Sequence, residues 1–379
     1  KKLQQLKDRF GKEKIRVGFL INDPAKWQYQ SLYEDLAKSD YFEPLVLVTE
    51  LVTYHKGKKR FYKDIETCYD FFKSRNFNVE YAYDKKKYIP IDFFNIDILF
   101  YEQPWELSDI QSPLSVSKTA LTCYCPYGLH LVEFYGTYMS DFHNLLWAMF
   151  VENDEVVERF SKIFGADNLF ATGYPKLDAY FSTESHEIND GHKKMIIYAP
   201  HHSFEEKGLN CATFAFNGQE ILELAKKYKD KIDWVFKPHP RFKSAVVLNK
   251  IMTEEEIDDY YQQWSDVGEI YDSGNYIDLF KQSDGLITDC LSFLGEYLPS
   301  KNPVFHLLGE KRPFNFLAKM FIDAYYKIEK DVLLEDIFRE VIIEQNDFKK
   351  EERCSKIKNV LSEEKCSMKI IKLIEDKMK

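Results

Sequence analysis

The sequence predicts an α/β protein made of two doubly wound domains, each built on a parallel sheet. Short apolar runs alternate with longer segments of helical character from the first residues onward, which is the order of βαβ units. The apolar runs are continuous, as expected of strands that are buried on both faces. A length of 379 residues exceeds what one hydrophobic core normally serves, so two domains are expected.

The first domain is expected at residues 15–180, after a basic N-terminal helical extension at residues 1–14. The extension has a narrow apolar side, so we expect it to be solvated. The domain opens with a strand, a helix and a second strand, which form a βαβ unit. The predicted elements are the strand 15–21, the helix 29–38, and the strands 44–48, 79–83, 96–101 and 121–125.

A polar stretch at 181–194 marks the boundary to a second domain, expected at residues 190–330. Its elements are the strands 195–198, 234–236, 285–288 and 304–307, and the helices 218–227, 276–282 and 291–298. The tail, 331–379, is rich in Lys and Glu with apolar spacing, which predicts helices that pack back on the sheets. We expect the strand ends of the two domains to face a cleft where ligands bind.

Composition narrows the classes of function. A net charge of −10 argues against nucleic acid as the main partner, because phosphate contacts need a basic face. Seven cysteines without a C-x-x-C pair favour a reduced, cytoplasmic protein. No run of 18 apolar residues is present, so no membrane span is expected.

The turn after the strand 285–288 is the first candidate site. The strand passes directly into a helix, with Asp289 as the helix-starting residue and Ser292 in the first turn. The first N–H groups of a helix lack internal partners and carry the positive end of its dipole, which suits a phosphate. The pattern indicates a nucleotide diphosphate ligand; an ordinary strand-to-helix turn is the alternative.

A second candidate turn follows the strand 195–198. Pro200 stops the strand, and His201, His202 and Ser203 then lie at its carboxyl end. These side chains would hydrogen-bond a phosphate or substrate, or form a plain loop. A metal site is not expected, because adjacent histidines commonly diverge and no carboxylate or Cys companion is evident.

The segment K-P-H-P-R, residues 237–241, follows the next strand. Two prolines flank His239 and fix the direction of its imidazole, while Lys237 and Arg241 place positive charge beside it. Each can donate a charge-assisted hydrogen bond to a phosphate oxygen. A capped turn with exposed cations is the alternative.

Two other turns complete the set. Ser273 or Asn275 is expected to cap the helix 276–282, and the same position could hold a ligand hydroxyl or phosphate. In the first half, a proline and a glycine force a turn that presents Tyr127 and His130. A base that receives an acceptor's proton would suit this position, and His titrates near neutral pH. A structural role for this His is the alternative.

These segments together resemble the CDP-glycerol glycerophosphotransferase family. The resemblance covers about residues 170–310 and rests on five motifs in order. They are G-Y-P-K-L-D at 173–178, Y-A-P at 198–200, K-P-H-P-R at 237–241, S-D-G-L-I-T-D at 283–289 with Ser292, and K-N-P-V-F at 301–305.

The resemblance implies a GT-B fold, with residues 15–180 as a Rossmann-like acceptor domain and residues 190–330 as a Rossmann-like nucleotide-donor domain. It also implies a metal-independent transferase without a cofactor, which uses a CDP-linked alditol to build teichoic-acid-like or capsular polymers. It implies that His239 and Arg241 meet the donor pyrophosphate and that Asp289 and Ser292 belong to the helix at the donor phosphate. The family usually carries a His-Gly pair where this chain has Tyr127-Gly128. His130 or Tyr127 is then expected as the base.

The expected reaction is attack by a hydroxyl of a surface glycan or teichoic-acid-like polymer on the β-phosphorus of the donor, with release of CMP. A lipid-linked acceptor would bring the protein to the inner face of the plasma membrane. One alternative is a GT-B glycosyltransferase that uses a nucleotide sugar. Another is a non-catalytic binding module of a capsule-assembly protein, because fold alone does not determine function.

Overall fold

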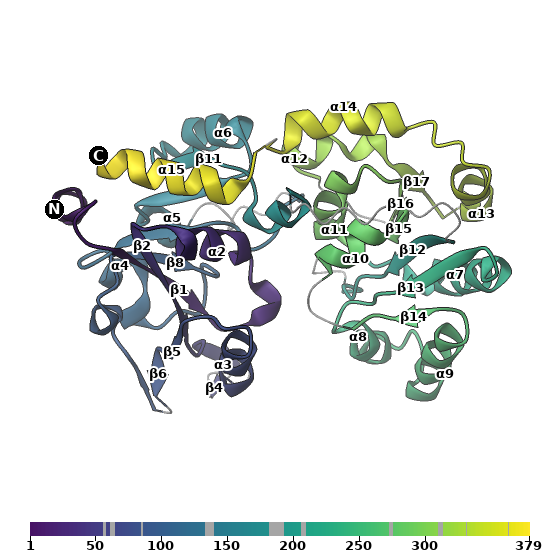
Figure 1. The fold of residues 1–379 in the computed structure, drawn as a ribbon. Helices are drawn as coiled ribbons and strands as arrows, with labels where there is room; N and C mark the ends of the chain where they lie inside the picture. Colours follow the sequence, from purple (N-terminus) through teal and green to yellow (C-terminus); the bar gives the residue numbers. More distant parts are fainter. Residues whose placement is uncertain are drawn as a thin grey trace. The chain divides into compact units, whose positions relative to one another are not determined.

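The computed structural model describes residues 1–55, 58–60, 65–84, 86–132, 140–181, 193–205, 210–272, 276–309, 314–330, 332–362 and 364–379. The chain divides into two compact units. Unit 1 comprises Lys1–Gly128, Phe134–Phe181 and Leu361–Lys379, and unit 2 comprises Leu129–Glu133 and Ser182–Val360. Each unit has helices on both faces of a parallel sheet (Figure 1), which confirms the predicted doubly wound architecture.

Unit 1 contains a seven-stranded sheet in the order β11-β10-β9-β8-β1-β2-β5. All its pairings are parallel. The strand order reverses between β1 and β8, which is the topological switch point where such folds bind ligands. The strands are β1 (Ile15–Ile21), β2 (Phe42–Val48), β5 (Val79–Tyr81), β8 (Ile98–Tyr101), β9 (Leu121–Tyr124), β10 (Ala148–Val151) and β11 (Leu169–Ala171).

Helices and two small hairpins surround this sheet. The hairpins pair β3 (Thr53–His55) with β4 (Lys58–Arg60) and β6 (Tyr83–Asp84) with β7 (Lys87–Tyr88). The α-helices are α1 (Lys2–Arg9), α2 (Gln30–Lys38), α3 (Ile65–Lys73), α4 (Pro113–Val116), α5 (Asp141–Asn144), α6 (Asp154–Phe164) and α15 (Cys366–Met378). The 3-10 helices are η1 (Pro24–Lys26), η2 (Ile91–Phe94), η3 (Asp109–Gln111) and η5 (Pro175–Phe181).

The N-terminal helix α1 is not the solvated extension that the sequence predicts. Leu6 is fully buried in the core of unit 1. Lys2 and Arg9 both form ion pairs with the buried Asp97, at 3.0 and 2.7 Å. The single buried leucine and these pairs fasten α1 to unit 1.

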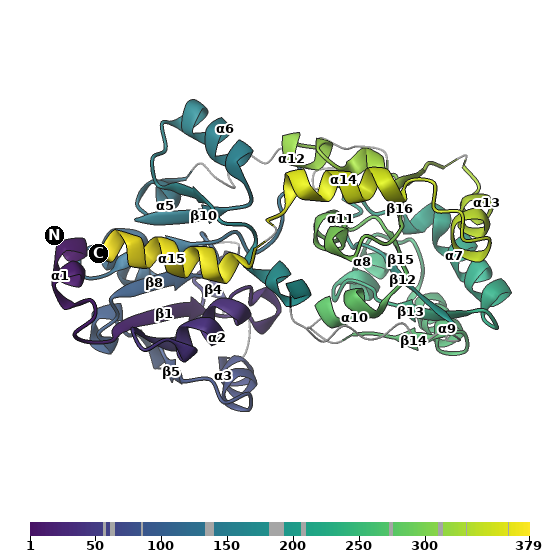
Figure 2. The ribbon, with the colours of Figure 1, turned by 45° about the horizontal axis from the view of Figure 1, so that its top comes forward.

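The tail at 331–379, treated as one segment in the sequence, divides between the units. Its last helix, α15, packs against α1 and α2 (Figure 2). Asp178, the last residue of the G-Y-P-K-L-D motif, accepts the backbone N–H groups of Cys366 and Ser367 at 2.6 and 2.8 Å. This motif residue therefore caps the first turn of α15.

Unit 2 contains a six-stranded sheet in the order β14-β13-β12-β15-β16-β17, again with parallel pairings. Numbered along the chain, this is the order 3-2-1-4-5-6 of dinucleotide-binding folds, with its switch point between β12 and β15. The strands are β12 (Lys194–Ala199), β13 (Ile232–Phe236), β14 (Glu269–Ile270), β15 (Gly285–Thr288), β16 (Val304–Leu307) and β17 (Tyr326–Ile328).

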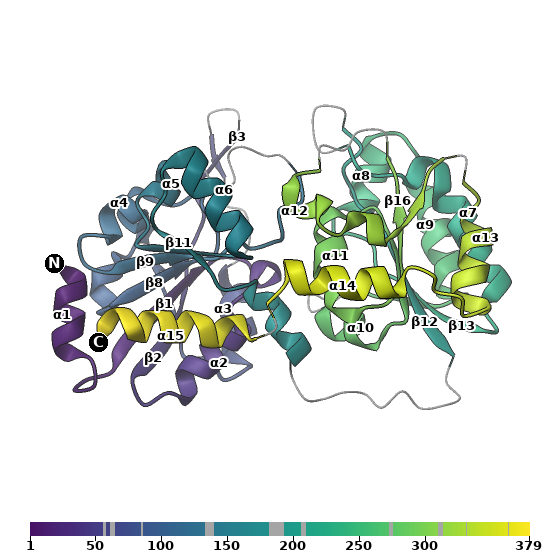
Figure 3. The same cartoon turned by 90° about the horizontal axis from the view of Figure 1, so that it is seen from above.

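The helices of unit 2 cover both faces of its sheet. Figure 3 shows α7, α8 and α9 on one face and α10, α11 and α14 on the other. The α-helices are α7 (Phe214–Tyr228), α8 (Phe242–Leu248), α9 (Glu254–Ser265), α10 (Ile277–Gln282), α11 (Leu291–Glu296), α12 (Phe316–Lys319), α13 (Leu334–Phe338) and α14 (Lys350–Val360). Shorter turns are η6 (Leu298–Ser300), η7 (Ile322–Ala324) and η8 (Arg339–Ile343).

Candidate active site

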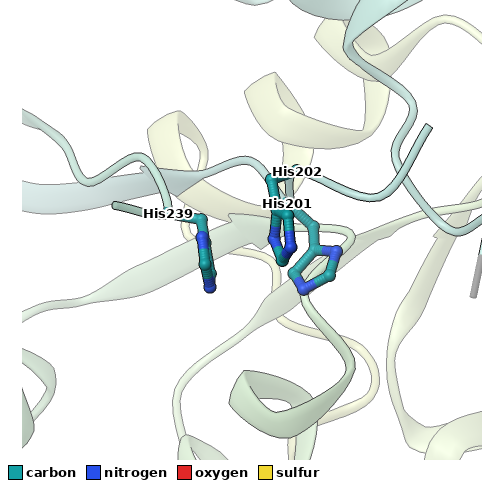
Figure 4. Close-up of side chains that lie close together, drawn as sticks. All are labelled: His201, His202 and His239. Atoms are coloured by element: carbon teal, nitrogen blue, oxygen red, sulfur yellow. The ribbon is translucent and has the colours of Figure 1, made fainter. Parts of the chain in front are cut away.

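Three histidines meet at the carboxyl edge of the sheet in unit 2. His201 and His202 follow β12, and His239 follows the neighbouring strand β13. Pro200 and Pro238 follow the ends of β12 and β13. Because these strands pair Tyr198 with Phe236, the chain turns at the same level after each of them. Ligand atoms of all three rings lie within 4.8 Å of one another (Figure 4). We refer to these three residues as the histidine cluster.

The rings of the cluster are packed face to face and edge to face. His202 and His239 stack with their centroids 3.8 Å apart and their planes at 24°. His201 lies 4.4 Å from His202 and 5.3 Å from His239, centroid to centroid. All three side chains are partly exposed, so a ligand can reach them.

Backbone hydrogen bonds set the tautomers of two of these rings. Nδ1 of His201 accepts the N–H of Ser203 at 3.2 Å, and Nδ1 of His239 accepts the N–H of Arg241 at 3.0 Å. A backbone N–H can only donate, so neither Nδ1 carries a proton. In the neutral ring the proton is then on Nε2. Each of these histidines therefore presents an Nε2–H donor.

The rings are neutral at pH 7. Burial lowers the pKa of His201 to about 3, with a smaller contribution from His202. Burial, followed by the other two histidines, Arg241 and Lys237, lowers the pKa of His239 to about 3. Burial and Arg241 also lower the pKa of His202. The cluster thus offers neutral donors beside a guanidinium.

This arrangement does not suit a metal ion. A metal lies in the plane of the imidazole, on the lone pair of a nitrogen. Nε2 of His201 and Nε2 of His239 carry protons, and reversing either tautomer would point an Nδ1–H at a backbone N–H. The stacked planes of His202 and His239 also direct their lone pairs side by side. The cluster is instead suited to an acceptor such as a phosphate oxygen.

Asp289 holds the histidine loop in place, and the prediction that it starts the helix α11 is wrong. Its side chain accepts the N–H of His201 at 2.6 Å, and the N–H and hydroxyl of Thr213 at 2.7 and 2.9 Å. Cys290 occupies the N-cap position of α11. Burial raises the pKa of Asp289 to about 6, while these hydrogen bonds oppose the rise. Its carboxylate oxygens accept these three hydrogen bonds, so Asp289 positions the loop that carries His201.

Ser203 orients His201 as well. Its hydroxyl lies 2.9 Å from Nδ1 of His201 and 3.1 Å from the sulfur of Cys211. Burial raises the pKa of Cys211 to about 12, so this residue stays a thiol. Nothing local in the sequence marks Cys211 or Thr213 as site residues, because neither follows a strand; only the fold brings them to the loop.

The two cations of K-P-H-P-R differ in their surroundings. Lys237 is buried, and its Nζ lies 5.4, 5.2 and 5.9 Å from the ring centroids of Tyr271, Tyr276 and Phe293. These distances are in the range of cation–π contacts. Arg241 is exposed at the start of α8. Of the two cations, Arg241 is the one with greater solvent exposure.

Of the remaining predicted donor residues, the structure describes Ser292, which follows the neighbouring strand β15. Ser292 is in the first turn of α11, and its hydroxyl is 3.6 Å from the sulfur of Cys290. Because β15 pairs with β12, this turn belongs to the same sheet edge as the histidine cluster. Ser273 and Asn275 lie outside the described residues.

The two candidate bases fall in different units. Tyr127 follows β9 in unit 1, where its carbonyl accepts the hydroxyl of Tyr174 at 2.7 Å. Burial raises the pKa of Tyr127, which disfavours the phenolate that a base requires. His130 is in unit 2, and its carbonyl accepts the side-chain amide of Asn315.

About half of the chain matches a known protein family. Residues 139–328 match the family described as CDP-Glycerol:Poly(glycerophosphate) glycerophosphotransferase. The match contains the histidine cluster, Arg241, Asp289 and Ser292, and excludes Tyr127 and His130. No curated protein sequence matches the chain.

Solved structures share the fold at low sequence identity. The S. aureus MnaA structure with UDP has a TM-score of 0.61 at 14% identity, with 95% of this chain and 96% of that chain covered. A Neisseria meningitidis UDP-GlcNAc 2-epimerase bound to UDP-GlcNAc gives 0.61 at 15%, covering 96% and 100%. The wall teichoic acid polymerase TagF gives 0.55 at 15%, covering 98% and 90%. These similarities confirm the GT-B fold.

Proposed function

The chain belongs to the CDP-glycerol:poly(glycerophosphate) glycerophosphotransferase family and is a glycerophosphotransferase, and we propose that its donor phosphates bind at the histidine cluster. The observation that carries this proposal is the pair of fixed Nε2–H donors on His201 and His239 beside Arg241. Preorganised donors of this kind stabilise charge that develops on phosphate oxygens.

The proposed reaction transfers glycerol phosphate from CDP-glycerol to a hydroxyl of a surface polymer. The acceptor oxygen forms a bond to the β-phosphorus, and the bond from that phosphorus to the bridging oxygen breaks. CMP leaves with the electron pair and the negative charge, and the hydroxyl proton passes to a base. His201, His239 and Arg241 would donate hydrogen bonds to the phosphate oxygens as this charge moves.

His130 is the better candidate for the base. An imidazole can accept a proton near neutral pH, whereas the buried Tyr127 would have to ionise against a raised pKa. His130→Ala should abolish turnover without changing the affinity for CDP. Loss of turnover in Tyr127→Phe, together with normal turnover in His130→Ala, would reverse the assignment.

The acceptor class and the location are part of the same proposal. The acceptor would be a polyol phosphate polymer or another hydroxyl-bearing surface glycan, free or carried on a lipid at the inner membrane face. Among the residues that the structure describes, no helix combines the length and apolar character needed to cross a bilayer.

Release of nucleotide from a panel of donors tests the function. CDP-glycerol, CDP-ribitol and UDP-N-acetylglucosamine are each incubated with the protein and a polyol phosphate primer, with and without EDTA. We expect CMP from CDP-glycerol, no UDP, and the same rate in EDTA. Release of UDP alone would support a nucleotide-sugar glycosyltransferase instead, and loss of the rate in EDTA would contradict the metal-free assignment of the cluster.

A further inference from the structure

Thr213 occupies the N-cap position of α7, but its side chain does not cap that helix. A threonine at this position usually accepts an N–H group of the first helical turn. Here the hydroxyl donates to a carboxylate oxygen of Asp289 at 2.9 Å, and the backbone N–H of Thr213 donates to the same oxygen at 2.7 Å. Thr213 is fully buried. Its side chain therefore serves the carboxylate that holds the histidine loop.

Asn217, one turn further along α7, sets the direction of this hydroxyl. Its side-chain Nδ2 donates to Oγ1 of Thr213 at 2.9 Å. Because Oγ1 accepts this bond, the hydroxyl proton points at Asp289. With the amide reversed, Oδ1 of Asn217 would draw the proton away and leave the acceptor oxygens of Thr213 and Asp289 facing each other at 2.9 Å.

Asn217 is an unfavourable residue for its position in the helix. Its side chain is 6% exposed, and Oδ1 has no hydrogen-bond partner among the described residues. Asparagine is a poor helix former, and a buried acceptor without a partner lowers stability. An apolar side chain of the same size would avoid both costs. It would also lack the hydrogen bond to Thr213, and this contact is what the asparagine supplies.

The chain of hydrogen bonds ends at the histidine cluster. The other oxygen of Asp289, Oδ1, accepts the backbone N–H of His201 at 2.6 Å. An ionised carboxylate accepts at both oxygens, whereas a protonated one would place a hydroxyl against one of the N–H groups that it now binds. The donors from Thr213 therefore favour the ionised form, which the loop requires.

We propose that Thr213 and Asn217 are positioning residues of the donor site, which act through Asp289 on the placement of His201. Asn217 orients the hydroxyl of Thr213, Thr213 holds the carboxylate, and the carboxylate holds the loop. The inference rests on the proposed function, because the ligand that it affects is the CDP-linked donor.

Asp289 is the group in this network that titrates near neutral pH. Burial raises its pKa to about 6, and the hydrogen bonds from Thr213 and His201 oppose the rise. Three further ionisable side chains interact with the carboxylate, and burial raises the pKa of each above its ordinary value. They are Cys211, Cys290 and Tyr198. All three are neutral between pH 5 and 8, as is His201, whose pKa is about 3.

The affinity for CDP-glycerol, titrated without acceptor between pH 5.5 and 8, tests the proposal. Thr213→Val removes the hydroxyl with little change in volume, and Thr213→Ser keeps it. Loss of one hydrogen bond to the carboxylate should move the fall in affinity about one pH unit higher. Binding by Thr213→Val should then be about fivefold weaker than wild type at pH 6 and within about twofold at pH 8. Thr213→Ser should follow the wild type.

Asn217→Leu separates positioning from packing. We expect it to weaken CDP-glycerol binding about threefold at pH 6, because the hydroxyl of Thr213 is no longer oriented. Its urea midpoint should equal or exceed that of the wild type, since the buried Oδ1 without a partner is gone. A purely structural residue would lose affinity and stability together. Gln219→Leu, on the exposed face of the same helix, is the matched control.

The same pH dependence in the wild type and in folded Thr213→Val would overturn the proposal, as would equal weakening at pH 6 and pH 8. Wild-type affinity at pH 6 in Asn217→Leu would also overturn it, and this variant decides the question if Thr213→Val does not fold. Failure of the wild-type chain to bind CDP-glycerol at every pH would instead count against the proposed function. The backbone amide signal of His201, followed by NMR from pH 5.5 to 8, would then still decide the network. Its midpoint should lie about one pH unit higher in Thr213→Val than in the wild type.

Discussion

At the scale of single residues, two hydrogen bonds from the backbone decide the chemistry of unit 2. The N–H groups of Ser203 and Arg241 each point at an Nδ1, and this sets where the protons of His201 and His239 lie. With the opposite tautomers, His201 and His239 would present lone pairs instead of N–H groups at Nε2. As they stand, they form a donor surface for an anion.

His239→Ala should lower kcat/KM for CDP-glycerol about 10²- to 10³-fold, because it removes one preorganised donor to the transferring phosphate. CMP release measures the effect. Lys243→Ala is the control, since Lys243 is on the adjacent helix α8 and pairs with Asp258 at the surface. A change below threefold in His239→Ala, with the fold intact, would remove this residue from the reaction.

Stability should fall as the pH drops below about 6.5, the ordinary pKa of histidine. The folded-state pKa values of His201 and His239 are lowered to about 3, so their contribution is present above pH 6.5 and is lost as pH falls toward 3. Each group contributes up to about 1.4 kcal/mol per pH unit.

Urea unfolding at pH 7.5 and pH 5.5 measures this loss in the wild type and in a His201→Asn, His239→Asn double variant. The wild type should lose about 3 kcal/mol more than the variant between these pH values, about 1.4 kcal/mol for each histidine. Asp289, with its raised pKa of about 6, acts in the opposite direction in both proteins and cancels in the comparison. Equal losses would show that the two histidines do not titrate as described.

At the scale of elements, a buried acidic side chain accepts backbone N–H groups from the loop that follows the first strand of each sheet. These side chains are Glu102 in unit 1 and Asp289 in unit 2. Asp289→Asn would place an NH2 group against an N–H that now donates to a carboxylate oxygen. We expect a loss of about 1–3 kcal/mol in unfolding free energy, together with weaker CDP binding because the loop with His201 loosens. Unfolding and CDP titration measure the two effects. Unchanged CDP affinity in the folded variant would show that the loop does not depend on Asp289, and the exposed Asp258→Asn serves as the control.

The turn between α9 and β14 depends on a glycine. A Cβ at Gly268 would lie 2.2 Å from the carbonyl oxygen of Trp234, whereas a Cβ at Gly128 would have no heavy atom within 4 Å. Gly268→Ala should therefore destabilise the protein by about 1–3 kcal/mol or more through overpacking. Gly128→Ala should stay within about 0.5 kcal/mol. Equal unfolding midpoints in urea for the two variants would contradict this packing.

At the scale of the whole molecule, the chain leaves unit 1, completes unit 2 and returns. The returning helix α15 buries Ile370, Ile374 and Met378 in the core of unit 1. A chain ending at residue 360 should lose amide protection across unit 1 and keep it in the sheet of unit 2, because each unit has its own core. Hydrogen exchange with mass spectrometry by peptide measures this, and unchanged protection in unit 1 would contradict it.

Much of this architecture could be predicted from the sequence. Each predicted strand is present, because a parallel strand buried on both faces leaves a continuous apolar run. Besides the two small hairpins, the prediction lacks four strands of the sheets, of which one is buried in the interior of its sheet and three are short strands at sheet edges. They are β10 (Ala148–Val151), β11 (Leu169–Ala171), β14 (Glu269–Ile270) and β17 (Tyr326–Ile328).

The sequence by itself determined the two parallel sheets and the turns that carry His201 and His239, since these depend on apolar runs and prolines that are local in the chain. Only the tertiary structure decided the tautomers of the cluster, the role of Asp289 and the return of α15 to unit 1. Those depend on groups far apart in sequence: Asp289 meets His201 across 88 positions and Asp178 meets Cys366 across 188. No local pattern records such contacts, because they form only when the strands pair and bring their ends to a common edge.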